Sequence, residues 1–437
     1  MAHDGSTLEQ AFQAIAIDDE GRACKDIPGS ACNDQPRNFF THVGSLSLSK
    51  LADGLIDPKL VLSWLMTSLG TPAYLIGLLV PVRESGALLP QLFTAGTIRE
   101  MPLRKYAWAA GAGVQGLAAL GLFASAMLLK GELAGWAMLG CLAVLALARS
   151  VCSVSYKDVL GKTVAKSRRG TATGLASSVS AAFVIVFAVM LITDWLPRME
   201  LVLGALALAG ILWIISAFLF LMLEEKKGAT EGGGSQSALF RQHYRVLKND
   251  RQLRTFILAR ACLTATALAP PFMISAASAG GQSAFEGLGF LVLASSGAAL
   301  VSSTVWGRLA DRSSRKVLFY AGGAGAAALA ATSISAGLGF LEFVWVLPAL
   351  LLVLMVAYQG VRLGRSTHLV DMADEDTRAI YTAVSNTIIG IVLIAGSLFG
   401  VIASLVGEMP VLAVMAALCA IGAFFAWRLE EVQAGKM

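Results

Sequence analysis

The stretch GRLADRSSRK, from Gly307 to Lys316, lies between two long apolar segments and carries five charges in ten residues, four of them basic. A degenerate copy, GTIREMPLRK, runs from Gly96 to Lys105, 211 positions earlier. Both copies come between apolar segments of similar length. A basic hairpin that repeats at about half the chain length predicts two homologous halves.

The composition is that of a membrane protein. Of the 437 residues, 56% are hydrophobic and only 14% are charged, and the mean hydropathy is +0.69. Soluble proteins carry about 25% charged residues, so this chain has too few charges for a soluble domain of its size. The formal net charge of +5 is spread over short loops, with no basic domain, which predicts a lipid bilayer and no nucleic acid as partner.

Twelve apolar segments follow a polar N-terminal stretch. A helix that crosses a membrane needs about 20 mostly apolar residues. We therefore predict an all-α membrane protein with twelve transmembrane helices, arranged as two six-helix, pseudo-symmetric bundles. The approximate spans are 39–66, 73–95, 107–129, 134–155, 172–193, 200–223, 255–277, 287–306, 317–338, 342–364, 380–405 and 409–428.

Polar stretches divide the chain into five expected parts. They are a flexible acidic cytoplasmic tail (1–38), an N-terminal bundle (39–223), a cytoplasmic linker (224–254), a C-terminal bundle (255–428) and a cytoplasmic C-terminal tail (429–437). The loops on one side of the membrane hold 21 Lys and Arg residues, whereas those on the other side hold only Lys130 and Arg198. Because basic loops stay in the cytoplasm, we expect a multi-pass protein of the cytoplasmic (inner) membrane with both termini inside.

Prolines lie at matching places in the two halves. Pro58 is in the first span, and Pro270 and Pro271 are in the seventh, about 212 positions later. Proline removes a backbone donor, which suits broken helices that line a cavity. These residues are the predicted helix breaks.

The hairpins resemble the signature loop of the major facilitator superfamily (MFS), which reads roughly G-x-L-A-D-R-x-G-R-K. The residues that match in the second half are Gly307, Leu309, Ala310, Asp311, Arg312, Arg315 and Lys316, with Ser314 in place of the second Gly. The first-half copy keeps Gly96, Glu100, Arg104 and Lys105. The resemblance implies a monomeric transporter whose halves rock about a central cavity.

Two further segments refine this resemblance. Leu147-x-Arg149 looks like the helix-4 motif of the superfamily, whose Arg is linked to proton coupling in many members. The Gly-Pro motif of drug–proton antiporters has no counterpart in the fifth span, which disfavours a drug exporter.

The second hairpin is a candidate cytoplasmic gate. Asp311 can pair with Arg residues across the gap between helices, and such contacts must break when the gate opens. For Asp311 and Arg315 we favour this role, because an acid in a basic turn adds nothing to the positive-inside bias. For the scattered basic residues, satisfying that bias is the simpler explanation.

Ionisable residues occur inside the first two spans. Lys50, Asp53 and Asp57 follow i, i+3, i+7 spacing and share one helical face. Arg83 and Glu84 are near the middle of the second span, and with Lys59 these charges sum to zero. Intramembrane charges usually mark substrate or ion pathways, so the three carboxylates are candidate proton carriers. The alternative is a set of structural salt bridges between the first two helices.

The second half has Ala294 and Ser295 at the positions equivalent to Arg83 and Glu84, so we expect the charges to be concentrated in the first half. Arg260, near the cytoplasmic end of the seventh span, is expected to be an anchor. Arg149 has two possible roles: it binds an anionic substrate or assists proton transfer, or it merely extends to the cytoplasmic membrane surface.

Together these features predict a secondary active transporter that moves a small molecule by alternating access, coupled to protons. The alternative is a non-transporting membrane sensor or assembly factor with the same fold. The six Cys lack the paired spacing of a metal site. Neither a nucleotide-binding loop nor a hydrolase motif occurs, so we expect no enzyme activity and no cofactor.

Overall fold

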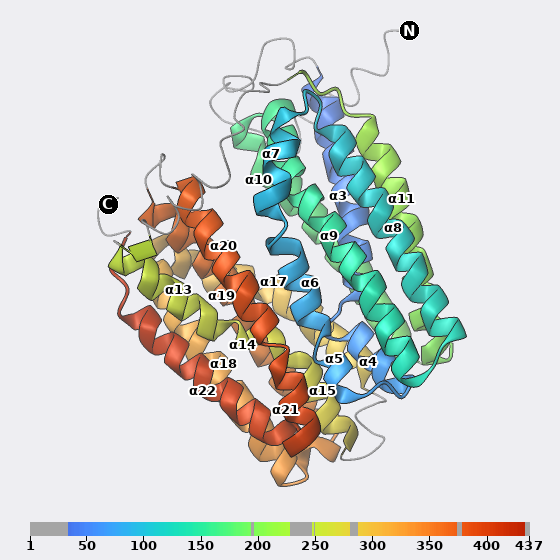
Figure 1. Cartoon of the computed structure of the whole chain (residues 1–437), viewed down its shortest axis with the longest axis vertical. Coiled ribbons are helices and arrows are strands. Elements are labelled where there is room, and N and C mark those ends of the chain that lie inside the picture. The colour runs from blue at the N-terminus through green and yellow to red at the C-terminus, as the bar shows by residue number, and fades with distance from the viewer. Residues whose placement is uncertain are drawn as a thin grey trace.

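The computed structural model of the chain describes residues 34–193, 196–227, 247–248, 250–279, 287–373 and 378–432. In these residues the regular structure is helical, without a β-strand. The chain forms two groups of helices that lie side by side (Figure 1). The first group is coloured blue to green and the second yellow to red.

In the described residues, the first group contains nine helices. They are α3 (Gln35–Ile56), α4 (Val61–Ser68), α5 (Ala73–Ile76), α6 (Leu79–Leu88), α7 (Gln91–Glu100), α8 (Lys105–Leu128), α9 (Gly131–Thr163), α10 (Lys166–Ile192) and α11 (Arg198–Leu221). Their core buries Leu62, Leu65, Leu122, Met138 and Trp213. These side chains come from α4, α8, α9 and α11, so one apolar core holds the group together.

The helices of the second group are α13 (Arg251–Leu263), α14 (Ala265–Leu268), α15 (Pro270–Ala279), α17 (Leu288–Arg312), α18 (Ser314–Gly337), η1 (Phe340–Glu342), α19 (Val346–Met372), α20 (Arg378–Ala395), α21 (Leu398–Val406) and α22 (Glu408–Trp427). The first span of the second group is broken, as in the first group, but its second span is the continuous helix α17 and its fifth is divided into α20 and α21. Met273, Leu329, Leu354 and Leu412 are buried in its core.

Nine helices in the described residues are long and apolar enough to cross a membrane. The three other predicted spans coincide with α3 and α4, with α5 to α7, and with α17. The first two are interrupted by breaks in the helix. α17 is one continuous helix, and its described segment Leu288–Ser302 is apolar.

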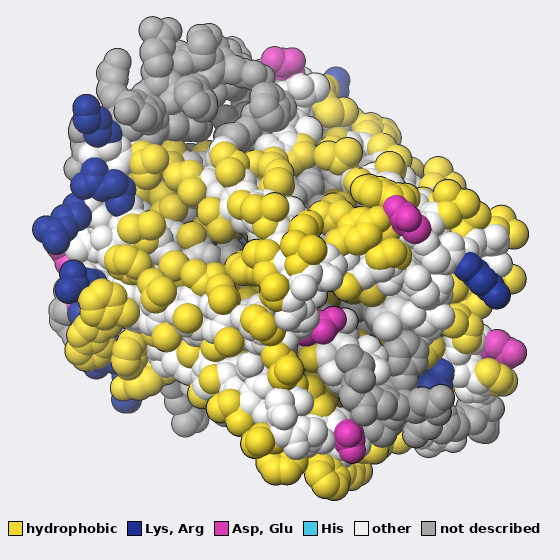
Figure 2. All heavy atoms as spheres, turned by 60° about the horizontal axis from the view of Figure 1, so that its bottom comes forward, with side chains coloured by type: hydrophobic (Ala, Val, Ile, Leu, Met, Phe, Trp, Pro, Cys, Tyr) yellow, Lys and Arg dark blue, Asp and Glu magenta, His cyan; other side chains and the backbone are white. Residues whose placement is uncertain are grey.

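The outer surface is apolar, the reverse of a soluble protein. Figure 2 shows a face made mostly of hydrophobic side chains, with most of the visible Lys and Arg gathered at its left edge. Large exposed side chains include Leu128, Leu133, Phe218, Trp345 and Leu405. An apolar surface of this extent fits a bilayer.

The first predicted helix break lies between α3 and α4. The helix ends at Ile56, and the Asp57 backbone leaves helical geometry with φ −15° and ψ 108°. The Lys59 N–H donates to the Asp57 Oδ1 atom (2.8 Å), and the Val61 N–H donates to the Asp57 carbonyl oxygen (2.9 Å). Asp57 thus binds the start of the next helix, just after Pro58. In the second half, α14 ends at Leu268 and α15 begins at Pro270, beside Pro271.

The two groups meet through α10 and α17, through α6 and α20, and through α5 and α21. At the last contact the backbones nearly touch, because a Cβ placed on Gly77 would lie 2.6 Å from Gly400 Cα. This contact is at the lower end of Figure 1, opposite the end where α3 begins and α22 ends. We call the latter the terminal end.

Candidate functional site

Asp53 on α3 is the centre of an ion cluster inside the first group. The Arg83 Nη2 atom on α6 lies 2.7 Å from Asp53 Oδ1, and the Arg149 Nη1 atom on α9 lies 2.6 Å from Asp53 Oδ2. All three side chains are partly accessible, with exposed fractions of 23%, 15% and 29% for Asp53, Arg83 and Arg149. Arg149 therefore points toward Asp53 and not toward a membrane surface.

Lys50 lies one turn before Asp53 but bonds to a different helix. Its ammonium group donates to Ser177 Oγ and to the Thr173 carbonyl oxygen (3.4 Å), both on α10. Asp57 lies one turn after Asp53 and stabilises the helix break. The shared face predicted for these three residues thus contacts three different parts of the structure.

Lys59 connects the two halves. Its side chain is buried, and the ammonium nitrogen lies 3.5 Å from the centroid of the Tyr358 ring on α19. This cation–π contact joins the broken first span to a helix of the second half. Glu84 on α6 is close enough to Lys59, Arg83, Arg362 and Arg365 to interact electrostatically with all four.

Two arginines of α19 correct the expectation that charge is concentrated in the first half. The predicted span ended at residue 364, but α19 continues to Met372 and brings Arg362 and Arg365 into the helix. Arg362 is solvent-exposed and interacts electrostatically with Glu84 and Asp53 of the other half. The charged site is therefore shared by both halves.

A sequence signal for these arginines exists. The buried positions Gly360, Val361, Gly364, His368 and Leu369 have helical spacing across the predicted boundary. No proline interrupts them. This periodicity predicts that the helix continues past residue 364.

Arg260 on α13 is buried, whereas an interfacial anchor was expected. Its guanidinium group donates to Ser385 Oγ (2.7 Å) and Asn386 Oδ1 (2.9 Å) on α20. It also experiences the positive field of Arg365. Arg260 thus adds a cation with neutral hydrogen-bond partners to the interior of the second half.

The first-half hairpin is attached to its own group. Arg104 forms an ion pair with Asp158 on α9, and its backbone N–H donates to Glu225 Oε1 (3.1 Å). The buried Glu225 carboxylate also accepts from the Lys105 N–H (2.8 Å) and from Lys162 Nζ (3.2 Å). These contacts join the terminal ends of α8, α9 and α11.

The second-half hairpin repeats this arrangement. Arg315 Nε lies 3.6 Å from Glu431 Oε2, and the Ser313 hydroxyl donates to the same oxygen (2.5 Å). Glu225 and Glu431 therefore have corresponding places, since each follows the last helix of its half and accepts hydrogen bonds from the hairpin of that half.

The structure shows fewer contacts for the other predicted gate residues. Glu100, Arg312 and Lys316 are exposed, and a Cβ on Gly307 would meet no atom within 4 Å. Gly96 and Asp311 lie in α7 and α17, but their side-chain positions are outside the described residues. Every ion pair in the described part of the chain joins residues of the same half.

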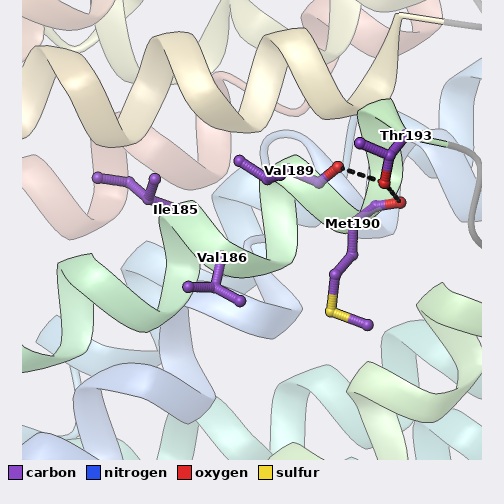
Figure 3. Close-up of a pocket in the computed structure, with 5 residues that line it drawn as sticks. All are labelled: Ile185, Val186, Val189, Met190 and Thr193. Carbon is purple, nitrogen blue, oxygen red and sulfur yellow. Dashed lines mark hydrogen bonds between the residues drawn. The ribbon is translucent and has the colours of Figure 1, made fainter.

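A shallow hollow elsewhere is not a candidate site. Four of the five residues that line it belong to α10, and the fifth, Thr193, directly follows this helix and is the polar one (Figure 3). The Thr193 hydroxyl donates to the Val189 carbonyl (3.0 Å) of its own helix, so it offers no free donor to a ligand. In the described residues, moreover, no group of three His, Cys, Asp or Glu could hold a metal ion.

No protein-family profile and no curated protein matches the sequence. Solved structures do match its shape. The nucleoside transporter NupG aligns with 14% identity over 90% of this chain and all of that chain (TM-score 0.68). A POT family transporter in complex with a thioalcohol-conjugated peptide aligns with 9% identity over 89% of this chain and 95% of that chain (TM-score 0.68).

The xylose transporter XylE from E. coli, in an inward-open conformation, aligns with 9% identity over 90% of this chain and 96% of that chain (TM-score 0.63). At such low identity these similarities concern the fold. They agree with the paired hairpins and the two groups of helices. The chain has the fold of the major facilitator superfamily of transporters.

Proposed function

We propose that this protein is a secondary active transporter of the cytoplasmic membrane that moves a small molecule by alternating access, coupled to protons. In this proposal the chain crosses the membrane twelve times and both termini are cytoplasmic. The nine apolar spans and the transporter fold support it. The excess of basic residues in the loops on one side supports the orientation.

The observation that carries the proposal is the ion cluster shared by the two halves. Charged residues at membrane depth are costly and are retained for function. Asp53 with Arg83 and Arg149 belongs to the first half, and Arg362 faces it from the second. A solute bound between these groups contacts both halves, as alternating access requires.

The contacts between the halves indicate an inward-facing state. Gly77 and Gly400 bring α5 and α21 together at the end away from the termini. At the terminal end, the described ion pairs stay within one half, so none of them holds the halves together there. Rocking about α10 with α17 and α6 with α20 would exchange the open and closed ends.

The proposal assigns proton carriage to Asp53. When Asp53 is ionised, both neighbouring guanidinium groups are paired with it. A proton on Asp53 weakens these charge-assisted bonds and releases Arg83 and Arg149 for other partners. Proton binding and solute binding then influence each other through the same two cations.

The direct test is transport in proteoliposomes that contain the purified full-length protein. Labelled nucleosides, dipeptides, pentoses and small organic anions are offered with and without an imposed pH gradient. Faster flux of one solute with the gradient supports the proposal. Equal rates in both conditions for every solute contradict proton coupling. No solute-dependent flux at all would favour the non-transporting sensor or assembly factor.

A further inference from the structure

The interior charges of the two halves do not balance. The cations that belong to this network are Lys50, Lys59, Arg83, Arg149, Arg260, Arg362 and Arg365. The carboxylates are Asp53, Asp57 and Glu84. Seven cations face three carboxylates, so the formal excess is four positive charges. The six charges of the first two spans sum to zero, and the excess comes from Arg149, Arg260, Arg362 and Arg365.

Three of the four excess charges belong to the second half. In the first half, Asp53 pairs with both Arg83 and Arg149 at ion-pair distance. Within the described residues, the hydrogen-bond partners of Arg260 are the neutral Ser385 and Asn386. In the residues that the structure describes, no carboxylate oxygen lies within 4.0 Å of a side-chain nitrogen of Lys59, Arg260, Arg362 or Arg365.

Cations of the two halves also repel one another. The Arg362 guanidinium carbon lies 6.0 Å from the centroid of the Tyr358 ring, which Lys59 of the first half contacts at 3.5 Å. There Arg362 is within electrostatic range of Lys50 on α3, as is Arg149 on α9. Arg362 is the exposed member of this group, and solvent reaches it. Guanidinium groups stay charged at any physiological pH, so the repulsion cannot be removed by loss of a proton from the arginines.

We propose that the transported solute is a small organic anion that carries a carboxylate or phosphate group, held between Lys50 and Arg149 of the first half and Arg362 of the second. This inference rests on the proposed transport function. A planar guanidinium group binds both oxyanions in a bidentate manner. A neutral sugar or nucleoside would leave the four excess charges uncompensated at membrane depth, which is costly.

The same charges explain why an empty carrier would resist closure. When the terminal end closes, Arg362 must approach Lys50 and Arg149, and like charges oppose this motion in a medium of low dielectric constant. An anion between them replaces this repulsion by attraction to all three cations. Bound solute would therefore lower the barrier to the transition that carries it across.

The test is ligand stabilisation of the purified full-length protein in detergent, which does not depend on transport. The probes are matched by skeleton: succinate, its neutral diamide succinamide and the dication putrescine, and glycerol 3-phosphate with glycerol. A ligand that binds only the folded state at about 100 times its Kd raises Tm by several degrees. Stabilisation by succinate would indicate a site for a carboxylate, and stabilisation by glycerol 3-phosphate would indicate a site for a phosphate group.

We expect at least one anion to raise the Tm of the wild type, and Arg362→Gln to lose most of that rise. Lys130→Gln removes an exposed charge far from the site and should keep it. The proposal is overturned if neither anion stabilises the wild type more than Arg362→Gln, or if a neutral or cationic probe stabilises it most. Anion binding without flux in proteoliposomes would instead contradict the transport function alone.

Discussion

Asp53 is the residue on which the proposed proton coupling depends. Asp53→Asn keeps the shape of the side chain but removes the charge that holds Arg83 and Arg149. A charge-assisted hydrogen bond contributes about 1.5–3 kcal/mol, so we expect gradient-driven flux to fall at least about tenfold. The matched control is Glu200→Gln, an exposed carboxylate at the start of α11. Wild-type flux in Asp53→Asn would make the cluster structural.

Asp57 has a structural role that can be separated from its charge. Asp57→Asn retains an oxygen that can accept from the Lys59 N–H, whereas Asp57→Ala does not. Loss of such a side-chain hydrogen bond to the backbone costs about 0.5–1.5 kcal/mol. We therefore expect a lower Tm for Asp57→Ala than for Asp57→Asn. Normal transport by Asp57→Asn would show that Asp57 carries no proton. Equal Tm values for the two variants would show that this hydrogen bond does not stabilise the helix break.

Much of this residue-level picture follows from the sequence. Charges inside the first two spans identify Asp53, Arg83 and Glu84 as unusual, and the helix-4 motif adds Arg149. Their pairing does not follow, because helical spacing says which residues share a face but not which helix that face meets. Lys50 therefore appeared equivalent to Asp53, although it bonds to α10.

At the level of helices, Glu225 is the main link at the terminal end of the first group. Its side chain has an exposed fraction of 0% and accepts from Arg104, Lys105 and Lys162. Removing one partner of a buried ion pair costs about 3–5 kcal/mol. We expect Glu225→Ala to lower Tm in detergent by several degrees.

The neighbouring residue provides the control for this variant. Glu224 has an exposed fraction of 51% and pairs with Arg37 at 3.5 Å. Exposed pairs contribute about 0–1 kcal/mol, so Glu224→Ala should leave Tm nearly unchanged. Equal effects of the two substitutions would show that the Glu225 contacts do not stabilise the first group.

Helix lengths were predictable where apolar periodicity is continuous and less so where a helix leaves the membrane. The tenth span was placed at 342–364 from its hydropathy, but α19 extends to Met372 with Arg362 and Arg365 in it. Hydropathy falls where a helix begins to carry charges, although the backbone remains helical. Because the predicted span ends too early, the predicted site lacks Arg362 and Arg365.

For the whole molecule, closure at the end away from the termini depends on glycine at the contact of α5 and α21. Gly77→Ala would place a Cβ 2.6 Å from Gly400 Cα, where backbone atoms must move apart. Overpacking of this kind costs about 1–3 kcal/mol, so we expect a lower Tm and slower uptake. Gly140→Ala, where a Cβ meets nothing within 4 Å, is the control. Identical behaviour of both variants would contradict closure at this contact.

The gate at the terminal end is a separate prediction for the whole molecule. Asp311→Asn should change the uptake rate by removing an acid that is proposed to hold the hairpin in the closed state. Initial uptake rates in proteoliposomes measure this effect. Wild-type kinetics in Asp311→Asn would remove Asp311 from the gate, while leaving the charged site between the halves unaffected.

Two halves could be predicted because the hairpin repeats, and the solved structures share that fold. The site between the halves could not, since Lys59 and Tyr358 meet only after both bundles have formed. Contacts between residues so distant in sequence leave no local pattern in one chain. The excess of positive charge therefore becomes visible only in the assembled molecule.

The central claim is that the Asp53 cluster couples solute movement to protons. Vesicles loaded with a pH-sensitive dye and containing wild type, Asp53→Asn or Lys130→Gln are given each solute of the panel in turn. We predict that at least one solute evokes a change of internal pH with wild type and Lys130→Gln, and that Asp53→Asn abolishes it. A response of full size in Asp53→Asn, or none in wild type with any solute, would contradict the account.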